Sequence, residues 1–165
     1  MSSKRGIVLY LHVHQPWRIR EYTVFDTAVR HDYFGKCNEP HRNNREIFQK
    51  VANKSYRPMT QLLKRLLDEH PEFKVSLSIS GTVLEQAEAW APDVIDSFRQ
   101  LVQTGRVEIV ADTYYHSLAF FFSRPEFERQ VELYRAKIRD LFGVETHVFR
   151  NTELSYDNNL ARWAD

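Results

Sequence analysis

Three of the four strand-like segments in this chain alternate between apolar and polar residues, and this alternation limits the folds open to it. The four segments cover residues 6–14, 73–80, 106–112 and 146–151, and helical patterns lie between them. Regular alternation of strands and helices favours parallel strands joined by right-handed crossovers. A doubly wound sheet buries both faces of its strands, which then read as continuous aliphatic runs. Strands with one polar face instead predict a barrel wall, with helices outside and polar groups inside.

The predicted inner face carries polar side chains toward the C-terminal ends of the strands. In the first segment, Leu11 and Val13 are expected to face the helices. His12 and His14 point the other way, because successive side chains along a strand alternate in direction. The polar residues on the same face of the next two strands are Ser76, Ser78, Ser80, Glu108 and Asp112. This pattern is typical of barrel strands that line an active site.

Length and strand number together predict an incomplete barrel. A chain of 165 residues can form one domain with a substantial core and is short for two. Four strands do not close such a barrel, and the final residues "NNLARWAD" read as a helix with no strand after it. We therefore predict an α/β fold in which residues 1–165 are the N-terminal portion of a single, truncated (β/α) barrel domain. Its four parallel strands alternate with helices.

Charge and composition exclude several classes of protein. The chain has 23 Lys plus Arg against 22 Asp plus Glu, a formal net charge of +1. No basic stripe provides a footprint for nucleic acid, so a neutral ligand fits better. The single cysteine, Cys37, suits a reducing compartment. No run approaches the roughly 20 apolar residues of a membrane span, and the N-terminal apolar run lacks a signal-peptide cleavage site. We expect a cytoplasmic protein that does not bind a membrane.

The connection over residues 15–44 has no clear periodicity and contains several aromatic residues. Loops of this length in a compact domain are usually functional or disordered. We interpret this one as a loop that covers the substrate.

His12 and His14 raise three hypotheses, since a strand that needed only to be buried would use aliphatic residues at both positions. They could be core histidines with satisfied hydrogen bonds. They could be metal ligands together with Asp112 or His116, although that spacing is not diagnostic. They could also donate hydrogen bonds to sugar hydroxyls at the floor of a pocket.

Two carboxylates are candidates for chemistry. Glu153 follows the fourth strand, three positions after Arg150, whose charge favours the ionised form. An ionised carboxylate at the mouth of a barrel suits a glycosyl nucleophile, whereas the alternative is a surface ion pair or an acidic residue at a helix start. Glu108, on the inner strand face, is either a structural partner or a substrate-site acid.

Three motifs then resemble the first signature regions of glycoside hydrolase family 57, in the family's order. They are "HVHQP" with His14 and Gln15, "GRVEIVADTYYHSLA" with Glu108, and "HVFRNTELSY" with Glu153. They fall at the first, third and fourth predicted strands, so the resemblance covers essentially the whole chain. The third motif is most similar to the α-amylase-like branch.

This resemblance implies an incomplete (β/α)7 barrel that cleaves or transfers α-glucans, such as maltooligosaccharides, with retention of configuration. Glu153 would be the nucleophile, and His14, Gln15 and Glu108 would line the pocket. His12, Trp17 and His116 would be pocket neighbours. The resemblance implies no cofactor and no catalytic metal, so the histidines would bind sugar hydroxyls.

The catalytic pair is incomplete within this sequence. A retaining mechanism needs two carboxyl groups about 5–5.5 Å apart, and the family's general acid, an aspartate, is expected beyond residue 165. Asp157 is the next acidic residue after Glu153, and we interpret it as the N-cap of the following helix. The partner of this chain would be the remainder of the barrel or a complementing chain.

Two alternatives belong to other functional classes. One is a metal-dependent polysaccharide deacetylase or hydrolase on a related barrel, with His12, His14 and Asp112 as ligands. The other is a non-catalytic carbohydrate-binding module, or one half of a split enzyme.

Overall fold

The computed structural model describes residues 6–29, 31–35 and 43–164. Its centre is a parallel sheet of three strands in the order β1-β2-β3: β1 (Tyr10–Val13), β2 (Val75–Ile79) and β3 (Val107–Ile109). In the register of the sheet, Leu11 lies beside Leu77, which lies beside Ile109. The parallel, α/β character of the fold is therefore confirmed.

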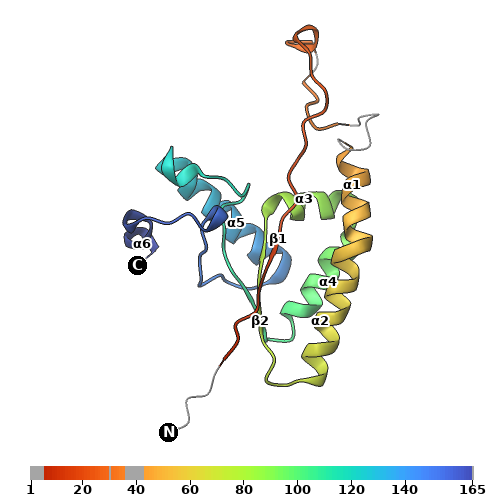
Figure 1. Cartoon of the computed structure of the whole chain (residues 1–165), viewed down its shortest axis with the longest axis vertical. Coiled ribbons are helices and arrows are strands. Elements are labelled where there is room, and N and C mark those ends of the chain that lie inside the picture. The colour runs from red at the N-terminus through yellow and green to blue at the C-terminus, as the bar shows by residue number, and fades with distance from the viewer. Residues whose placement is uncertain (1–5, 30, 36–42, 165) are drawn as a thin grey trace.

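Six α-helices connect and cover the strands in the described part of the chain (Figure 1). They are α1 (Asn44–Val51), α2 (Arg57–Glu69), α3 (Gly81–Trp90), α4 (Pro92–Val102), α5 (Arg124–Phe142) and α6 (Asn158–Ala164). A π-helical stretch, Ala52–Tyr56, joins α1 to α2 just before Pro58. A wider turn at this place accommodates the proline ring, which would clash with a carbonyl of the preceding α-helical turn.

The predicted fourth strand is reduced to one bridge. Ala111 pairs in parallel with Phe149: its amide donates to Val148 O at 2.8 Å, and its carbonyl accepts from Arg150 N at 2.9 Å. Beyond Ile109, Tyr134 of α5 takes over hydrogen bonds that a longer ladder would supply, since its hydroxyl donates to Val110 O at 3.2 Å and accepts from Ile79 N at 3.4 Å. The described residues thus form three strands and a bridge, where we expected four strands, and they do not close a barrel.

The first strand is also shorter than the predicted 6–14. Its pairing starts near Val75, where β2 begins, because Leu9 O accepts from Ser76 N at 3.0 Å. Residues 6–8 have no neighbouring strand in the described chain, and the Ile7 side chain is almost fully exposed.

The core lies on the apolar face of the sheet, as the alternation predicts. Leu11 and Val13 pack against it, and Leu77 and Ile79 are buried within it. The helices add Phe48, Leu63, Leu67, Val83, Leu84, Val94, Phe98, Leu101 and Ile138. A second cluster, centred on Phe127, Val131 and Leu160, holds α6 against α5.

The predicted covering loop projects away from the sheet in Figure 1. Asn44 fixes its base: the side-chain amide donates to Arg18 O at 2.9 Å and Phe34 O at 3.2 Å, and its oxygen accepts from Arg18 N at 2.8 Å. Arg20 N donates to Tyr33 O at 2.9 Å, so the two arms of the loop run side by side. Residues 36–42, with Cys37, lie outside the described residues. None of the described helices combines the length and the apolar character needed to cross a membrane.

Candidate active site

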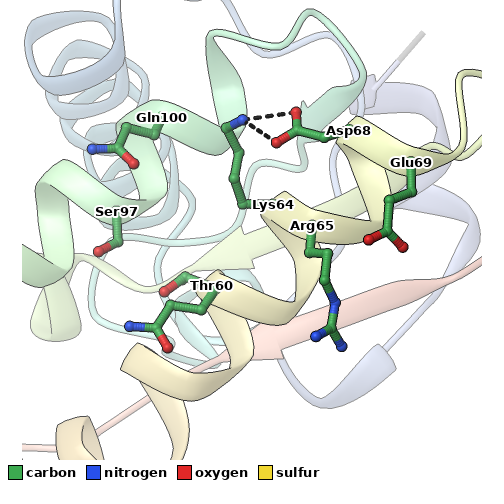
Figure 2. A pocket seen from close by; sticks show the side chains of 8 residues that line it. Thr60, Lys64, Arg65, Asp68, Glu69, Ser97 and Gln100 are labelled. Atoms are coloured by element: carbon green, nitrogen blue, oxygen red, sulfur yellow. Dashed lines mark hydrogen bonds and ion pairs between the residues drawn. The ribbon is translucent and has the colours of Figure 1, made fainter.

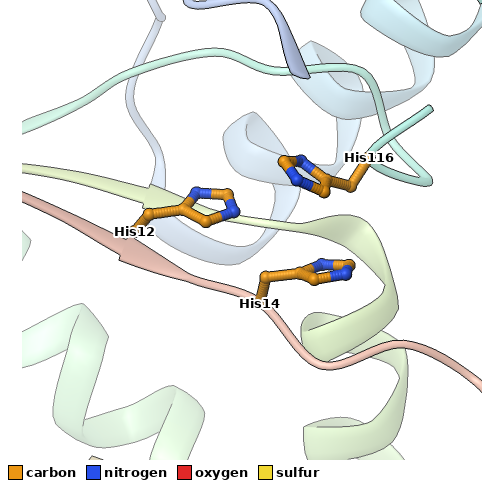
Figure 3. A group of neighbouring side chains, drawn as sticks. All are labelled: His12, His14 and His116. Atoms are coloured by element: carbon orange, nitrogen blue, oxygen red, sulfur yellow. The ribbon is translucent and has the colours of Figure 1, made fainter. Parts of the chain in front are cut away.

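Three histidines meet at the C-terminal ends of the strands (Figure 3). His12 and His14 come from β1 and the residue after it, and His116 comes from the loop that follows β3. The ring centroids of His116 lie 4.6 Å from His12 and 4.4 Å from His14, and those of His12 and His14 are 5.8 Å apart. The predicted pairing of His12 and His14 on one strand face is therefore confirmed.

His116 links a buried carboxylate to an exposed one. Its Nδ1 donates to Asp112 Oδ2 at 2.7 Å, and its Nε2 lies 3.1 Å from Glu153 Oε1. The Asp112 side chain is fully buried, whereas that of Glu153 is 76% exposed. The other oxygen of Asp112 accepts from Thr113 N at 2.7 Å and from the Thr152 hydroxyl at 3.1 Å. These bonds fix Asp112, which in turn fixes the orientation of His116.

Unusual backbone conformations bring Glu153 to His116. His116 has φ of 52°, and Glu153 and Leu154 have φ of 55° and 59°. Non-glycine residues with positive φ are uncommon and cost about 1–3 kcal/mol each, and they are concentrated at functional sites. The turn that carries Glu153 is closed by Leu154 N donating to Asn151 O at 3.1 Å.

The charges within the site reinforce one another. The hydrogen bond from His116 to Asp112 raises the pKa of His116 despite its burial, and Glu153 contributes less. The hydrogen bond from His116 also lowers the pKa of Glu153, so that this carboxylate is ionised. Arg150, which the sequence suggested as the cation beside Glu153, has a smaller effect on the Glu153 pKa. The Arg150 Nη1 donates to the Tyr10 hydroxyl at 3.3 Å.

The other two histidines are neutral at physiological pH. Partial desolvation, followed by the charge of His116, lowers the pKa of His12 and lowers that of His14 to about 4. His14 Nδ1 lies 2.9 Å from the Ser80 hydroxyl, which is 2.9 Å from the Thr82 hydroxyl. Our sequence reasoning placed Ser80 on the inner face but gave it no role. The signal was its position two residues beyond Ser78 on a polar face.

Gln15 and Trp17 bond to α3 rather than to the histidines. Gln15 is buried, and its carbonyl accepts from Gln86 Nε2 at 2.9 Å. Trp17 Nε1 donates to Glu85 Oε2 at 3.0 Å, and its ring packs edge-on against Trp90 with centroids 5.3 Å apart. Both residues position the chain just after the cluster.

Glu108 lies lower on the strands than the rest of the predicted site. It is exposed, in register with Ser76, whose hydroxyl is 3.4 Å from Glu108 Oε2. Asp112 lies four residue steps farther along the extended chain, a span of about 13 Å. The structure therefore brings together His12, His14, His116 and Glu153, but not Glu108.

Asp157 caps α6, as predicted. Its Oδ1 accepts from Asn159 N at 2.8 Å and from Leu160 N at 2.9 Å. These bonds occupy the carboxylate, which confirms its interpretation as a helix cap.

Other hollows offer less chemistry. One lies between α2 and α4 and is lined by the residues in Figure 2, where Lys64 pairs with Asp68 at 2.6 Å. A second runs along the edge of β1, and its lining includes His12 and His14 together with Met59 and Leu63 of α2. The histidine cluster therefore remains the candidate site, and its groups can hold a charge, bind hydroxyls or hold a metal ion.

Comparisons with known proteins agree on one family. The family model described as Glycosyl hydrolase family 57 matches residues 8–165. A putative alpha-amylase of Methanocaldococcus jannaschii is 40% identical over 160 residues, covering 96% of this chain and 33% of the relative. A 4-alpha-glucanotransferase of Thermococcus litoralis is 33% identical over 109 residues, covering 66% of this chain and 16% of the relative.

Solved structures have a similar fold. The crystal structure of the Thermococcus litoralis 4-alpha-glucanotransferase superposes with a TM-score of 0.66 at 25% identity, covering 95% of this chain and 20% of that one. A family 57 branching enzyme of Thermococcus kodakaraensis superposes with a TM-score of 0.61 at 16% identity, covering 88% of this chain and 32% of that one. The chain thus spans about a third or less of the length of these proteins.

Proposed function

The chain belongs to glycosyl hydrolase family 57, and we propose that it forms the N-terminal part of a retaining enzyme that hydrolyses or transfers α-glucans. The curated relatives are named as amylases and glucanotransferases. Those names favour a glucan substrate over the metal-dependent deacetylase alternative. A maltooligosaccharide is the proposed substrate, with water or a second glucan as acceptor.

The observation that carries this proposal is the position of Glu153. Its carboxylate is exposed, has a lowered pKa, and is held by a histidine that is itself anchored to buried Asp112. In the proposed first step, Glu153 attacks the anomeric carbon, the glycosidic bond breaks, and a general acid protonates the departing oxygen. In the second step the same group, now a base, deprotonates the acceptor as it releases the sugar from Glu153.

We propose that the general acid is outside this sequence. Asp112 is fully buried and already bonded to His116, so it has no path to a glycosidic oxygen. The relatives extend well beyond the matched region. A longer polypeptide or a complementing chain would supply the second carboxyl group and the remainder of the barrel.

The neutral histidines are proposed to bind the reacting sugar. A neutral imidazole can donate a hydrogen bond through one nitrogen and accept through the other, which suits sugar hydroxyls. His12 and His14 lie beside His116 and are within reach of the same ligand. Gln15, Trp17 and Glu108 are proposed to line the pocket that holds the glucan.

The test is covalent trapping of the nucleophile in the natural protein. A 5-fluoro-α-glucosyl fluoride should leave a sugar on the peptide that contains Glu153, detected by mass spectrometry. Glu153→Gln should abolish both the adduct and turnover without loss of folding. Glu145→Gln is the matched control, since Glu145 forms an exposed ion pair with Arg139. An adduct on another residue, or unchanged turnover in Glu153→Gln, would sink the assignment.

A further inference from the structure

We propose that His12, His14 and His116 also form a binding site for a divalent transition metal, with Zn²⁺ as the best candidate, and that the metal blocks the site. One ring nitrogen from each histidine lies within 4.8 Å of the other two. The three rings converge from β1 and from the loop after β3 (Figure 3). Imidazole ligands suit Zn²⁺ and copper, whereas Ca²⁺ and Mg²⁺ prefer oxygen.

Two of the histidines are already oriented as zinc ligands usually are. A metal-bound histidine generally donates its second ring N–H to a carboxylate or another oxygen, which fixes the ring and its tautomer. His116 Nδ1 lies 2.7 Å from Asp112 Oδ2, and His14 Nδ1 lies 2.9 Å from the Ser80 hydroxyl. Each arrangement directs Nε2 away from that oxygen partner, although His116 Nε2 also lies 3.1 Å from Glu153 Oε1.

The spacing of the three ring nitrogens is close to the spacing of the ligands in a tetrahedral zinc site. Two nitrogens at about 2.0–2.1 Å from Zn²⁺ are roughly 3.4 Å apart in tetrahedral geometry. The rings therefore need to close by an ångström or so from the observed separation of up to 4.8 Å. His12 is exposed, so its ring can turn without disturbing the core.

Glu153 determines the consequence of binding. Its Oε1 lies 3.1 Å from His116 Nε2, the atom that would bind the metal. A metal at that nitrogen either recruits Glu153 as a fourth ligand or displaces it. In both cases the carboxylate and the histidines are no longer arranged for another ligand, so the metal and that ligand compete.

Direct binding of ZnCl₂ to the tag-free, chelator-treated protein tests this proposal without any assay of turnover. Calorimetry should show one equivalent bound, and Co²⁺ should give the visible absorption of a tetrahedral site. His12→Ala and His14→Ala should each weaken binding more than tenfold. Asp112→Asn should weaken it by about 10–100-fold, because Asp112 orients a ligand.

His70→Ala is the matched control, because His70 is exposed at the end of α2, far along the chain from the cluster. Its zinc affinity should equal that of the unmodified protein. Since His12 is exposed, His12→Ala keeps the test valid if another variant fails to fold. Absence of zinc binding, or equal affinity in His12→Ala and His70→Ala, would overturn the proposal.

Discussion

Asp112 and His116 are joined by a 2.7 Å hydrogen bond within a single turn of chain, with the carboxylate fully buried. His116 N donates to Thr113 O at 3.0 Å, so the chain folds back between the two residues. This return directs His116 Nε2 outward to Glu153. Asp112 thereby stabilises the positive charge of His116, and that charge in turn lowers the pKa of Glu153.

Asp112→Asn should weaken the electrostatic link from Asp112 through His116 to Glu153. The amide cannot stabilise an imidazolium, so the pKa of His116 should fall and that of Glu153 should rise toward its ordinary value. Loss of a charged hydrogen bond should lower the free energy of unfolding by about 1.5–3 kcal/mol, measured by urea denaturation. In the natural protein, kcat should fall more than KM rises, and the acidic limb of its pH profile should move upward.

Asp140→Asn is the control for that variant, because Asp140 is an exposed residue of α5. It should change neither the stability nor the pH profile. An Asp112→Asn protein with an unaltered His116 titration would show that the hydrogen bond does not set the charge of the imidazole.

The pKa values of His14 and His116 should lie on opposite sides of the ordinary histidine value of 6.5. His14, with its pKa lowered to about 4, binds fewer protons in the native than in the unfolded state between these values. Its contribution to stability is therefore lost as pH falls through this window. His116, whose pKa is raised, stabilises the native state below 6.5, and that contribution is lost as pH rises through its folded pKa.

Ring ¹⁵N shifts of metal-free protein measure both titrations. His14 should remain neutral at pH 5 while His116 is still charged above pH 6.5. A midpoint for His14 near 6.5 would contradict the buried, neutral imidazole.

The sequence predicted which way the strand residues point, but not how far along the strands they lie. Alternation correctly placed Leu11 and Val13 on the face that packs against the core and His12 and His14 on the polar face. The same alternation placed Glu108 on that face, yet it cannot show that Glu108 lies below the cluster, since the relative height of parallel strands depends on register.

The contacts of Glu153 could not be predicted for a different reason. They depend on positive φ at His116 and Glu153. Neither residue is a glycine or an asparagine, the types from which a sequence most readily predicts positive φ. The fourth strand was overpredicted because local pattern does not show whether a neighbour extends the ladder. Tyr134, from a helix distant in sequence, takes part of that role.

Ser80→Ala should loosen His14 without weakening α3. Ser80 lies at the N-cap of α3, but its side chain makes no capping bond there. The variant therefore removes a hydroxyl that lies 2.9 Å from both His14 Nδ1 and the Thr82 hydroxyl, at a cost of about 1 kcal/mol in the free energy of unfolding. Ser76→Ala is the control, since its hydroxyl makes a long hydrogen bond of 3.4 Å to exposed Glu108, and a change under about 0.5 kcal/mol is expected. Equal effects of the two substitutions would argue against a structural bond between Ser80 and His14.

Zinc should inhibit the natural protein reversibly if both proposals hold. Because the metal would occupy the histidines that bind the sugar, ZnCl₂ should raise the apparent KM for a maltooligosaccharide, and chelator should restore turnover. His12→Ala, compared with its own metal-free rate, should need at least ten times more ZnCl₂ for half-inhibition, whereas His70→Ala should match the unmodified protein. Inhibition of equal strength in His12→Ala would place the inhibitory metal elsewhere. Zinc binding that leaves turnover unchanged would support the metal site but contradict the proposal that the bound metal blocks glucan turnover.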